Sequence, residues 1–512
     1  MTGAESLLRT LVTNGVDTCF MNPGTSEMHF VAALDRVPGM RGVLCLFEGV
    51  CSGAADGYAR VLGQPASTLL HLGPGLANGL ANFHNARKAR SPIVNIVGEH
   101  ATQHLVVDAP LSSDIATFAK TVSGYVRTAT SADDIGQATA ETILAAWGPP
   151  GVVASLIIPA DYSWSQATVG GPVVAPKVRT MPEFGRLEKA AELVRKPGTA
   201  ILLGGAASNR KALEAGARLA AATGVKIIVA RNSGSQVGGR DSYDIPAVPY
   251  FPEGALPMFA DVQNLILVEA ERPVSFFAYP GIPSEMTAPG CVDFVLASRS
   301  EDGTEAMLAL ADGCPRVWLG DAESLTAPSD DAALTLEAVG RTVAALMPEG
   351  AIIADELVSS AGEVHAQLRH AAPFDFLPVT GGSIGQGLPV AVGAAIAAPH
   401  RKVISLEADG SAMYTLQALW TMVRENLDVT VVIMNNRRYK ILEIEMRRTG
   451  ANGFGPLAND MIDISRPDLD FVKLAEGMGV EASRARTARE FAEQFGDAMG
   501  RPGPRLIEAC VA

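Results

Sequence analysis

An acidic residue and an amide residue, each just after a hydrophobic run, carry the strongest chemical signal in the chain. Asp409 follows the run 403–406, and Asn436 follows the run 429–434, which places them 436 − 409 = 27 residues apart. A helical segment between the runs predicts a strand–helix–strand unit, whose strands end at the sheet edge where α/β proteins bind ligands. A carboxylate, a carboxamide oxygen and a nearby carbonyl suit Mg²⁺, and helix-start amides at Ser411 suit an anion. For either half alone, the alternative is an ordinary turn.

Together the two halves resemble the diphosphate and Mg²⁺ motif of thiamine-diphosphate enzymes, a GDG-type turn followed by two asparagines. In this chain Ala408 replaces the first glycine of the turn. The resemblance implies that Asp409, Asn436 and the carbonyl of Arg438 bind the metal. It also implies that Gly410 and Ser411 contact the cofactor's diphosphate.

A second acidic residue, Glu48, stands where the hydrophobic run 42–47 meets a helix rich in small residues. One interpretation is that it caps this helix, because acidic residues favour the first turn. The surrounding segment LFEGVCSGAADGYAR is similar to the glutamate-bearing segment of the 2-oxo acid decarboxylase and acetolactate synthase group. The resemblance implies that Glu48 contacts N1′ of the cofactor's aminopyrimidine ring and so promotes the tautomer that activates the thiazolium carbon.

Two further segments match cofactor contacts of this family. In the glycine-rich stretch 380–385, the resemblance implies that the Gly382 carbonyl binds the cofactor's 4′-amino group and that Ile384 supports the bent rings. The alternative interpretation is a glycine-rich turn before a helix at 389–398, and that turn is required whether or not the stretch binds the cofactor. Ser359 matches a diphosphate contact, and a helix N-cap is the alternative for it.

The stretches 22–27 and 70–75 look most like the benzoylformate decarboxylase group, which implies that Thr25 binds the substrate carboxylate and that His71 relays protons. The alternative for His71 is a strand-end histidine bonded to backbone. The segment 273–281 lacks the second histidine of that group, so protonation would fall to His100, His104 or Tyr279, and carboligation stays open. The pocket is expected around positions 25, 71, 277 and 442, under a lid formed by residues 437–455.

The elements that must position these residues alternate between strand and helix along all 512 residues. This pattern predicts an α/β protein of three doubly wound, parallel-sheet domains at 1–163, 184–322 and 335–512. Linkers are expected at 164–183 and 321–333. The resemblance makes the first domain pyrimidine-binding and the third diphosphate-binding, with a middle domain between them.

Composition excludes several classes of protein. A net charge of −14 and a pI near 5.1 argue against a nucleic-acid partner, and no apolar run has membrane-spanning length. The six cysteines are scattered, show no CxxC spacing and suit a reducing cytoplasm. The N-terminal segment lacks the basic start of a signal peptide.

The leading hypothesis is therefore an enzyme dependent on thiamine diphosphate and Mg²⁺ that cleaves or forms the C–C bond next to the carbonyl of a 2-oxo acid. One alternative is an acetolactate synthase-type transferase without FAD. Others are an FAD- or NAD-dependent oxidoreductase, disfavoured because the turn GGAAS is no GxGxxG, and a non-catalytic paralogue that binds the cofactor. The resemblance implies a homodimer at least, commonly a homotetramer, with each site shared between chains.

Overall fold

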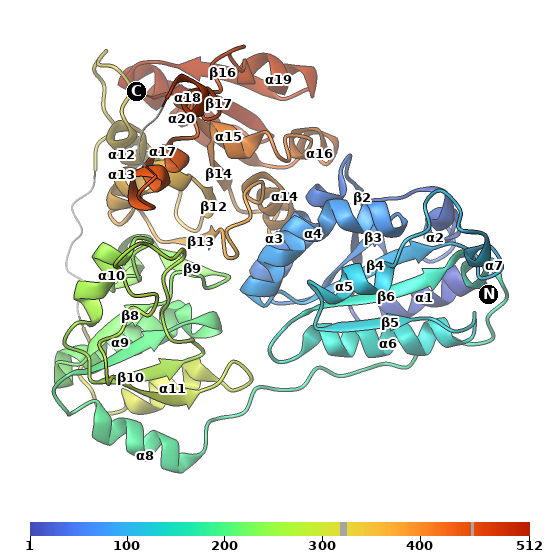
Figure 1. The fold of residues 1–512 in the computed structure, drawn as a ribbon, viewed down its shortest axis with the longest axis horizontal. Coiled ribbons are helices and arrows are strands. Elements are labelled where there is room, and N and C mark those ends of the chain that lie inside the picture. Colours follow the sequence, from blue (N-terminus) through green and yellow to red (C-terminus); the bar gives the residue numbers. More distant parts are fainter. Residues whose placement is uncertain (318–324, 452–454, 512) are drawn as a thin grey trace.

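The computed structural model describes residues 1–317, 325–451 and 455–511. Within these ranges the strands form three sheets with helices on their faces, and Figure 1 shows three lobes that follow the chain from blue through green to red. This is the doubly wound α/β architecture that the alternating pattern predicts. The expected domain end at 322 and the start of the second linker lie outside the described residues. No helix in the described ranges is both long and apolar enough to cross a membrane.

The N-terminal lobe is built on a parallel sheet. Its strands, in spatial order, are β2 (Arg41–Leu44), β1 (Thr18–Asn22), β3 (Ala66–Leu70), β4 (Ile93–Glu99), β6 (Val153–Pro159) and β5 (Tyr125–Thr128). Its helices are α1 (Gly3–Thr13), α2 (Met28–Leu34), α3 (Glu48–Leu62), α4 (Leu72–Ala89), α5 (Ile115–Lys120), α6 (Asp134–Trp147) and α7 (Ala160–Trp164), with the short 3₁₀ turns η1 (Thr25–Glu27) and η2 (Leu105–Val107). The strand expected over 42–47 ends earlier, so a three-residue loop separates β2 from Glu48.

The first predicted linker, residues 164–183, is extended and contacts the N-terminal lobe. It forms no helix or named strand between α7 and α8 (Phe184–Leu193), and in Figure 1 it runs from the N-terminal lobe to the green lobe. Its first half packs on α1, where Ser6 donates to the carbonyl of Val169 at 2.9 Å and the amide of Val174 donates to Asn14 at 2.7 Å. The linker is therefore held against the N-terminal lobe by side chains of α1 and of its C-cap residue, Asn14.

The middle lobe has a smaller parallel sheet in the order β11 (Val292–Ala297), β10 (Asn264–Val268), β7 (Thr199–Leu203) and β8 (Lys226–Val229). Its helices are α8 (Phe184–Leu193), α9 (Arg210–Thr223), α10 (Pro252–Phe259) and α11 (Gly303–Leu310), with 3₁₀ turns η3 (Gly205–Ser208) and η4 (Gly239–Ser242). One strand of this part of the chain, β9 (Gln236–Gly238), leaves the lobe and pairs antiparallel with β13 (Phe374–Pro378) of the C-terminal sheet.

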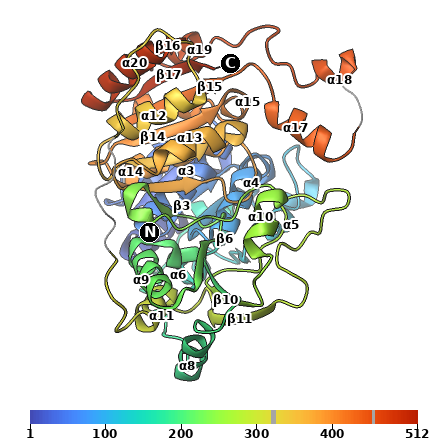
Figure 2. The same cartoon turned by 90° about the vertical axis from the view of Figure 1, so that its left-hand side faces the viewer.

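The C-terminal lobe carries the longest sheet. Its order is β16 (Glu481–Ala485), β17 (Arg505–Cys510), β15 (Val429–Asn435), β14 (Val403–Ala408), β12 (Ile352–Glu356), β13 (Phe374–Pro378) and β9. Its helices are α12 (Leu336–Leu346), α13 (Ala361–Leu368), α14 (Gly387–Ala397), α15 (Asp409–Ala412), α16 (Ala418–Arg424), α17 (Lys440–Arg448), α18 (Pro456–Asp460), α19 (Phe471–Gly477) and α20 (Ala488–Gly500), with the 3₁₀ turn η5 (Val358–Ser360). Figure 2 shows α17 and α18 projecting from this lobe.

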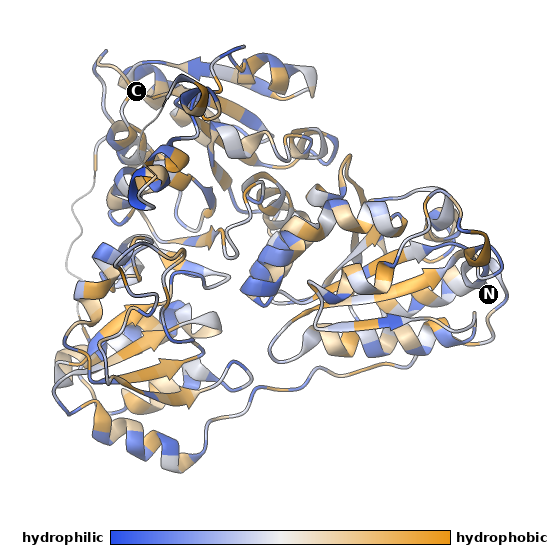
Figure 3. Cartoon of the chain, in the orientation of Figure 1, coloured by the Kyte–Doolittle hydropathy of each residue, from blue (hydrophilic) through white to orange (hydrophobic). Residues whose placement is uncertain are grey.

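The first and last lobes meet through α3 and α14, two helices made mainly of small residues. A Cβ atom at Gly57 would collide with the carbonyl of Val390, and one at Gly393 would collide with the carbonyl of Ala54. Glycine at these two positions lets the helices approach closely, and one hydrophobic core runs through both lobes. Figure 3 shows apolar residues along the strands of all three lobes.

A buried ion pair adds polar contacts to this junction. Arg60 of α3 pairs with Asp56, and the two side chains are 2% and 0% exposed. The same guanidinium donates to the carbonyl of Pro378 at 2.8 Å and to the hydroxyl of Thr380 at 3.0 Å. The arginine thus ties the N-terminal lobe to the segment that enters the predicted cofactor loop.

We expect Arg60→Met to lower the unfolding free energy by about 3 kcal/mol or more, because it leaves a buried carboxylate without its counter-ion. Urea unfolding followed by circular dichroism measures the loss. The control is Arg36→Met, which removes a half-exposed partner of Glu5 and should cost about 1 kcal/mol or less. Equal losses in the two variants would contradict a special role for Arg60.

Candidate active site

The predicted catalytic residues follow four neighbouring strands of the N-terminal sheet. Glu48 comes after β2, Thr25 after β1, His71 after β3 and His100 after β4, and these strands are adjacent and parallel. Parallel strands present their carboxyl ends at one edge, so all four segments meet at the same edge of the lobe. This topology is consistent with the prediction from the sequence that these residues lie near one another.

Glu48 opens α3 but does not cap it. Its side chain is buried, and the helix has no side-chain cap. Its Oε2 instead accepts a hydrogen bond from the Asn78 amide of α4 at 2.9 Å, while Oε1 lies over Gly75. In the described chain Asn78 is the hydrogen-bond partner of this carboxylate, so one oxygen is left for a ligand.

A second buried carboxylate, Glu27, holds His71 in place. Its Oε2 lies 2.7 Å from Nδ1 of His71 and accepts the amide of Gly24 at 2.8 Å. Burial raises the pKa of Glu27, whereas the histidine and the amide lower it. The alternative that His71 is bonded to backbone is wrong, because Nδ1 faces a carboxylate. The imidazole lies against Gly24, and the residue that follows Gly24 in the chain, Thr25, is exposed.

The three residues suggested as replacements for the missing histidine differ in their surroundings. His100 and His104 lie with ring centroids 5.3 Å apart, and Nε2 of His100 is buried without a partner in the described residues. Tyr279 is buried and donates to Glu445 of α17 at 3.0 Å, with Arg448 over its ring. Burial raises the pKa of Tyr279. This tyrosine therefore links the middle lobe to α17. Of the three residues, His100 is the one with a buried ring nitrogen that has no hydrogen-bond partner among the described residues.

The glycine-rich loop 381–385 is held from the N-terminal lobe by one face of α4. Asn82 donates to the carbonyls of both Gly49 and Gly385, at 2.8 and 3.1 Å. Asn85 donates to the carbonyl of Ser383 at 2.7 Å and accepts its amide at 3.1 Å. Gly382 has φ +77°, a conformation that favours glycine, and Ile384 is half-buried.

The turn predicted to bind the metal follows two neighbouring strands of the C-terminal sheet. Strands β14 and β15 are parallel neighbours, with Ala408 opposite Met434, so Asp409 and Asn436 leave the sheet side by side. Oδ2 of Asp409 accepts the amides of Asn436 and Arg437, at 3.0 and 2.6 Å. Instead of one following helix, two short ones occur, α15 and α16, because residues 413–417 form turns between them. Ser411 is buried in the first and donates to the carbonyl of Ala408.

This donor set fits a divalent cation. Asp409 is 2% exposed, burial raises its pKa, and its partners in the described residues are backbone amides without any cationic side chain. Oδ1 of Asn436 accepts the amide of Arg438, whose own carbonyl accepts the amide of Lys440. Carboxylate, amide and carbonyl oxygens retain lone pairs for a hard cation.

Other predicted contacts have mixed outcomes. Ser359 lies half-buried in η5 and does not cap α13, whose N-cap position is Ser360. The preceding Val358 has φ +51°, a strained value for a β-branched residue.

Around the expected substrate pocket, Phe276 rather than the more exposed Phe277 lies against Gly382. Leu442 is nearly half exposed, and residues 452–454 of the expected lid lie outside the described residues.

The cationic residues of the lid pair with nearby acids. Glu443 lies within 3.1 Å of both Arg438 and Lys440 and also pairs with Arg447. Arg437 is half exposed and lies 3.7 Å from Asp468. These pairs favour solvated surface charges over a site for an acidic substrate.

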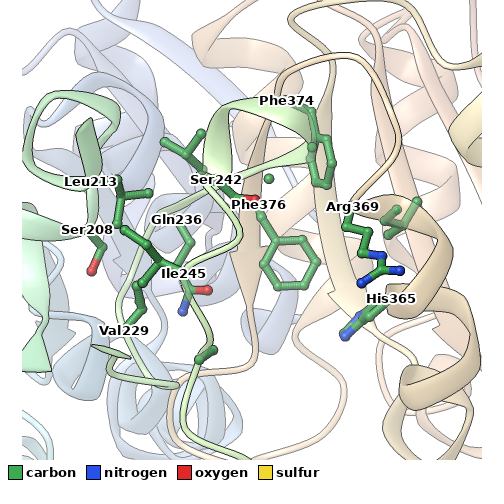
Figure 4. A pocket seen from close by; sticks show the side chains of 15 residues that line it. Ser208, Leu213, Val229, Gln236, Ser242, Ile245, His365, Arg369, Phe374 and Phe376 are labelled. Carbon is green, nitrogen blue, oxygen red and sulfur yellow. The ribbon is translucent and has the colours of Figure 1, made fainter. Parts of the chain in front are cut away.

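A cavity of about 230 Å³ lies at the seam of the middle and C-terminal lobes. Figure 4 shows Ser208 and Gln236 on one side and His365, Arg369 and Phe374 on the other. None of the predicted cofactor or catalytic residues lines it. The cavity is therefore separate from the candidate active site.

Sequence reasoning missed the residues that hold the predicted ones. Asn78, Asn82 and Asn85 recur at i, i+4 and i+7, which puts them on one face of α4, and this polar stripe was visible in the sequence. Glu27 stands in the quoted turn, yet its contact with His71 joins residues 44 positions apart. Only the strand order brings those two together.

The chain belongs to the thiamine pyrophosphate enzyme family. Residues 1–117 match the description "Thiamine pyrophosphate enzyme, N-terminal TPP binding domain", and residues 359–509 match "Thiamine pyrophosphate enzyme, C-terminal TPP binding domain". The N-terminal match contains Glu48 and His71, and the C-terminal match contains Asp409 and Asn436. The chain is accordingly an enzyme of the thiamine-diphosphate-dependent type.

Two relatives cover nearly the whole chain. A Mycobacterium tuberculosis protein provisionally described as an acetolactate synthase large subunit, IlvX, is 49% identical and covers 100% of this chain and 99% of its own. Benzoylformate decarboxylase of Pseudomonas aeruginosa is 27% identical and covers 97% of this chain and 96% of its own.

Two solved structures share the fold. Thiamine diphosphate-dependent 4-hydroxybenzoylformate decarboxylase of Rhodococcus jostii RHA1 has a TM-score of 0.86 at 24% identity, covering 100% of this chain and 99% of its own. Benzoylformate decarboxylase of Polynucleobacter necessarius has a TM-score of 0.85 at 19% identity, covering 100% and 98%. Both confirm the three-lobed α/β architecture.

Proposed function

We propose that this enzyme binds thiamine diphosphate with Mg²⁺ and cleaves or forms the C–C bond next to the carbonyl of a 2-oxo acid. The observation that carries this proposal is that the chain holds two buried carboxylates, one in the N-terminal lobe and one in the C-terminal lobe, whose surroundings differ. Glu48 keeps one oxygen free at the edge of the N-terminal sheet, and Asp409 lies beside Asn436 without a cationic partner among the described residues. These match the two ends of one cofactor.

The cofactor, when bound, supplies the nucleophilic carbon and stores the electron pair of the broken bond. Asp409, Asn436 and the carbonyl of Arg438 would hold the metal, with Ser359, Gly410 and Ser411 at the diphosphate. Glu48 would bind the aminopyrimidine while Asn78 fixes its other oxygen. His71, oriented by Glu27, would hold or move a proton at Nε2, since its Nδ1 is engaged.

The deciding experiment is a panel of 2-oxo acids with thiamine diphosphate and Mg²⁺, in which released CO₂ and ligated product are followed separately. A decarboxylase releases CO₂ with free aldehyde, whereas an acetolactate synthase-type transferase, the second candidate suggested by the 49% identical relative, consumes a second carbonyl compound. Cofactor binding without turnover of any acid would contradict the proposal and favour the non-catalytic alternative.

We expect Glu27→Ala and His71→Ala each to lower kcat/KM by about 10²-fold, because the imidazole needs the carboxylate for its orientation. The double variant should lose little more than either single variant, since the two residues act as a unit. Affinity for thiamine diphosphate should stay unchanged in all three. Fully additive losses would show that Glu27 does not act through His71.

We further propose that the middle lobe binds no dinucleotide, because the side chain of Glu269 occupies the position where the phosphates of a dinucleotide would bind. Ligands of doubly wound sheets bind where the strand order reverses, here between β7 and β10. Glu269, directly after β10, is buried and accepts the amides of Ala206 and Gly303, both at 3.1 Å. Arg179 of the linker pairs with the same carboxylate at 2.6 Å.

Glu269 also has φ +50°, which glycine adopts more readily. The wild-type enzyme should therefore be colourless and give no signal on titration with FAD or ADP. Glu269→Gly should relieve the backbone and open the site to these ligands, while Glu271→Gly, at an exposed neighbour, should not. A stoichiometric flavin in the wild-type enzyme would contradict this proposal.

We propose a homodimer or homotetramer in the cytoplasm, with sites completed between chains. Apolar side chains are exposed beside the site residues, including Leu46 before Glu48, Val106 after His104 and Tyr414 against Gly385. A second chain covering them would bury this surface. All six cysteines are free thiols, which suits a reducing compartment. Analytical ultracentrifugation tests the assembly, and a stable monomer at micromolar concentration would contradict it.

A further inference from the structure

One arginine joins α17 to the middle lobe. Arg448 is the last residue of α17, and the central carbon of its guanidinium lies 4.2 Å from the ring centroid of Phe251 and 4.5 Å from that of Tyr279. The same guanidinium pairs with Glu253 in the first turn of α10, which lies below α17 in Figure 1. The arginine side chain is only 19% exposed, although α17 contains no fully buried residue. The middle lobe therefore holds this helix at its C-terminal end.

The surroundings of Arg448 are mainly aromatic. An aromatic face attracts a guanidinium most strongly where both are shielded from water. Nε of Arg448 is buried and has no acceptor among the described residues, so the rings account for much of its contact with the middle lobe. Tyr279 also donates to Glu445, one turn earlier in α17, at 3.0 Å. We call the contacts of Arg448 with Phe251, Glu253 and Tyr279 the α17 clamp.

The N-terminal end of α17 lies on the turn that is proposed to bind the diphosphate. Tyr439, the N-cap residue of α17, covers Gly410 so closely that a Cβ atom at Gly410 would collide with the tyrosine ring. The helix also packs against η5, which contains Ser359. Arg448 follows Tyr439 by 448 − 439 = 9 residues, about 13 Å along a helix. Thus α17 extends from the diphosphate turn to the middle lobe.

Aromatic residues next to the clamp reach the glycine-rich loop as well. Phe276 lies against Gly382, and its ring centroid is 5.1 Å from that of Tyr250. The ring of Tyr250 is in turn 4.9 Å from that of Phe251, which belongs to the clamp. The middle lobe therefore contacts the proposed cofactor surface of the C-terminal lobe in two places, directly at Gly382 and through α17 at Gly410.

We propose that Arg448 is a positioning residue for the cofactor, because it fixes α17 to the middle lobe and thereby keeps Tyr439 over the diphosphate turn. The middle lobe then supports the cofactor site without binding a ligand of its own. In the absence of the clamp, part of the binding free energy would be spent on ordering α17. This inference rests on the proposed function, since the position of Tyr439 matters only if the turn at Gly410 binds thiamine diphosphate.

Two substitutions of Arg448 and one of its neighbour test the clamp by calorimetric titration of the apo-enzyme. Arg448→Met keeps the length of the side chain without its charge, so affinity for thiamine diphosphate with Mg²⁺ should fall about tenfold. Arg448→Lys keeps the charge without the planar face and should lose only about threefold. The matched control is Arg447→Met, because Arg447 is 73% exposed and pairs with Glu443 on the surface. This control should stay within about twofold of wild type.

Three further readouts separate positioning from a general loss of structure. At saturating cofactor, kcat of Arg448→Met should stay within about twofold of wild type, since only cofactor affinity is affected. Hydrogen exchange of residues 441–449 in the apo-enzyme should be about tenfold faster in Arg448→Met than in wild type or Arg447→Met. Phe251→Leu should also weaken binding, and combining it with Arg448→Met should weaken binding no further, because the ring acts through the guanidinium.

Unchanged affinity of Arg448→Met would overturn the proposal, whether or not exchange in α17 becomes faster. A lower kcat at saturating cofactor, or fully additive losses in the double variant, would contradict it as well. If Arg448→Met does not fold, Arg448→Lys and Phe251→Leu provide the same comparison with Arg447→Met. If wild type itself binds no thiamine diphosphate, the proposed function fails, whereas the exchange rates still show whether Arg448 fixes α17.

Discussion

Replacing Glu48 with glutamine should leave the chain folded and able to bind thiamine diphosphate, but should lower turnover by about 10³-fold, within the range for loss of an acid–base group. The fold should survive because the glutamine oxygen can still accept the hydrogen bond from Asn78. The lost first-turn charge of α3 costs about 1 kcal/mol or less. Turnover should fall because an amide cannot exchange a proton with the aminopyrimidine nitrogen.

Release of CO₂ and calorimetric cofactor binding, measured on the same preparation, check this expectation. The matched control is Glu337→Gln, which alters an exposed first-turn carboxylate in α12 and should leave both measurements unchanged. Near-normal turnover of Glu48→Gln with every substrate would remove Glu48 from the mechanism. Loss of binding together with turnover would instead make it a cofactor anchor.

Replacing Asp409 with asparagine should weaken binding of Mg²⁺ and thiamine diphosphate by about 10²-fold or more, since a direct ligand should matter at least as much as the groups that support ligands. The apo-enzyme, however, should become more stable than wild type at pH values above the raised pKa of Asp409. Burial raises the pKa of Asp409, so the ionised form costs stability as pH rises through that raised value, and the neutral amide avoids this cost.

Titration with Mn²⁺ as a paramagnetic substitute reports the metal directly, and thermal unfolding of the apo-enzyme at several pH values reports the stability. Asp375→Asn is the control, because Asp375 lies in the same sheet but its side chain is 40% exposed and pairs with Arg401. Unchanged Mn²⁺ affinity in Asp409→Asn would place the metal elsewhere. Lower apo-stability at high pH would contradict the argument from burial.

The two variants together test whether a site is shared between chains. If Glu48 of one subunit serves Asp409 of another, mixing Glu48→Gln with Asp409→Asn chains after dissociation should restore about a quarter of wild-type activity through random pairing. If one chain supplies both residues, no mixture regains activity. Asn82 already joins Gly49 to Gly385 within one chain, so this experiment separates two arrangements with different physical bases.

Sequence reasoning succeeded in placing residues side by side where their proximity follows from local order. Asp409 and Asn436 each follow a strand of one strand–helix–strand unit, so their proximity is a property of that unit. It failed where strands lack a hydrophobic pattern. The edge strand β16 reads EASRA and the edge strand β5 reads YVRT, and both form through pairing with a neighbour rather than through their own composition. The contacts of Glu27 and Asn78 depend on strand order, which one sequence leaves open.

The short strand β9 changes how the chain can be divided. Because residues of the middle lobe complete the outer edge of the C-terminal sheet, a fragment beginning at residue 335 would expose the β13 edge with its unpaired backbone groups. Such an edge recruits strands from other molecules. The middle lobe thus covers a sheet edge of the C-terminal lobe that would otherwise favour aggregation. If the middle lobe were exchanged for that of a relative, residues 236–238 of this chain would have to be kept so that this edge stayed paired.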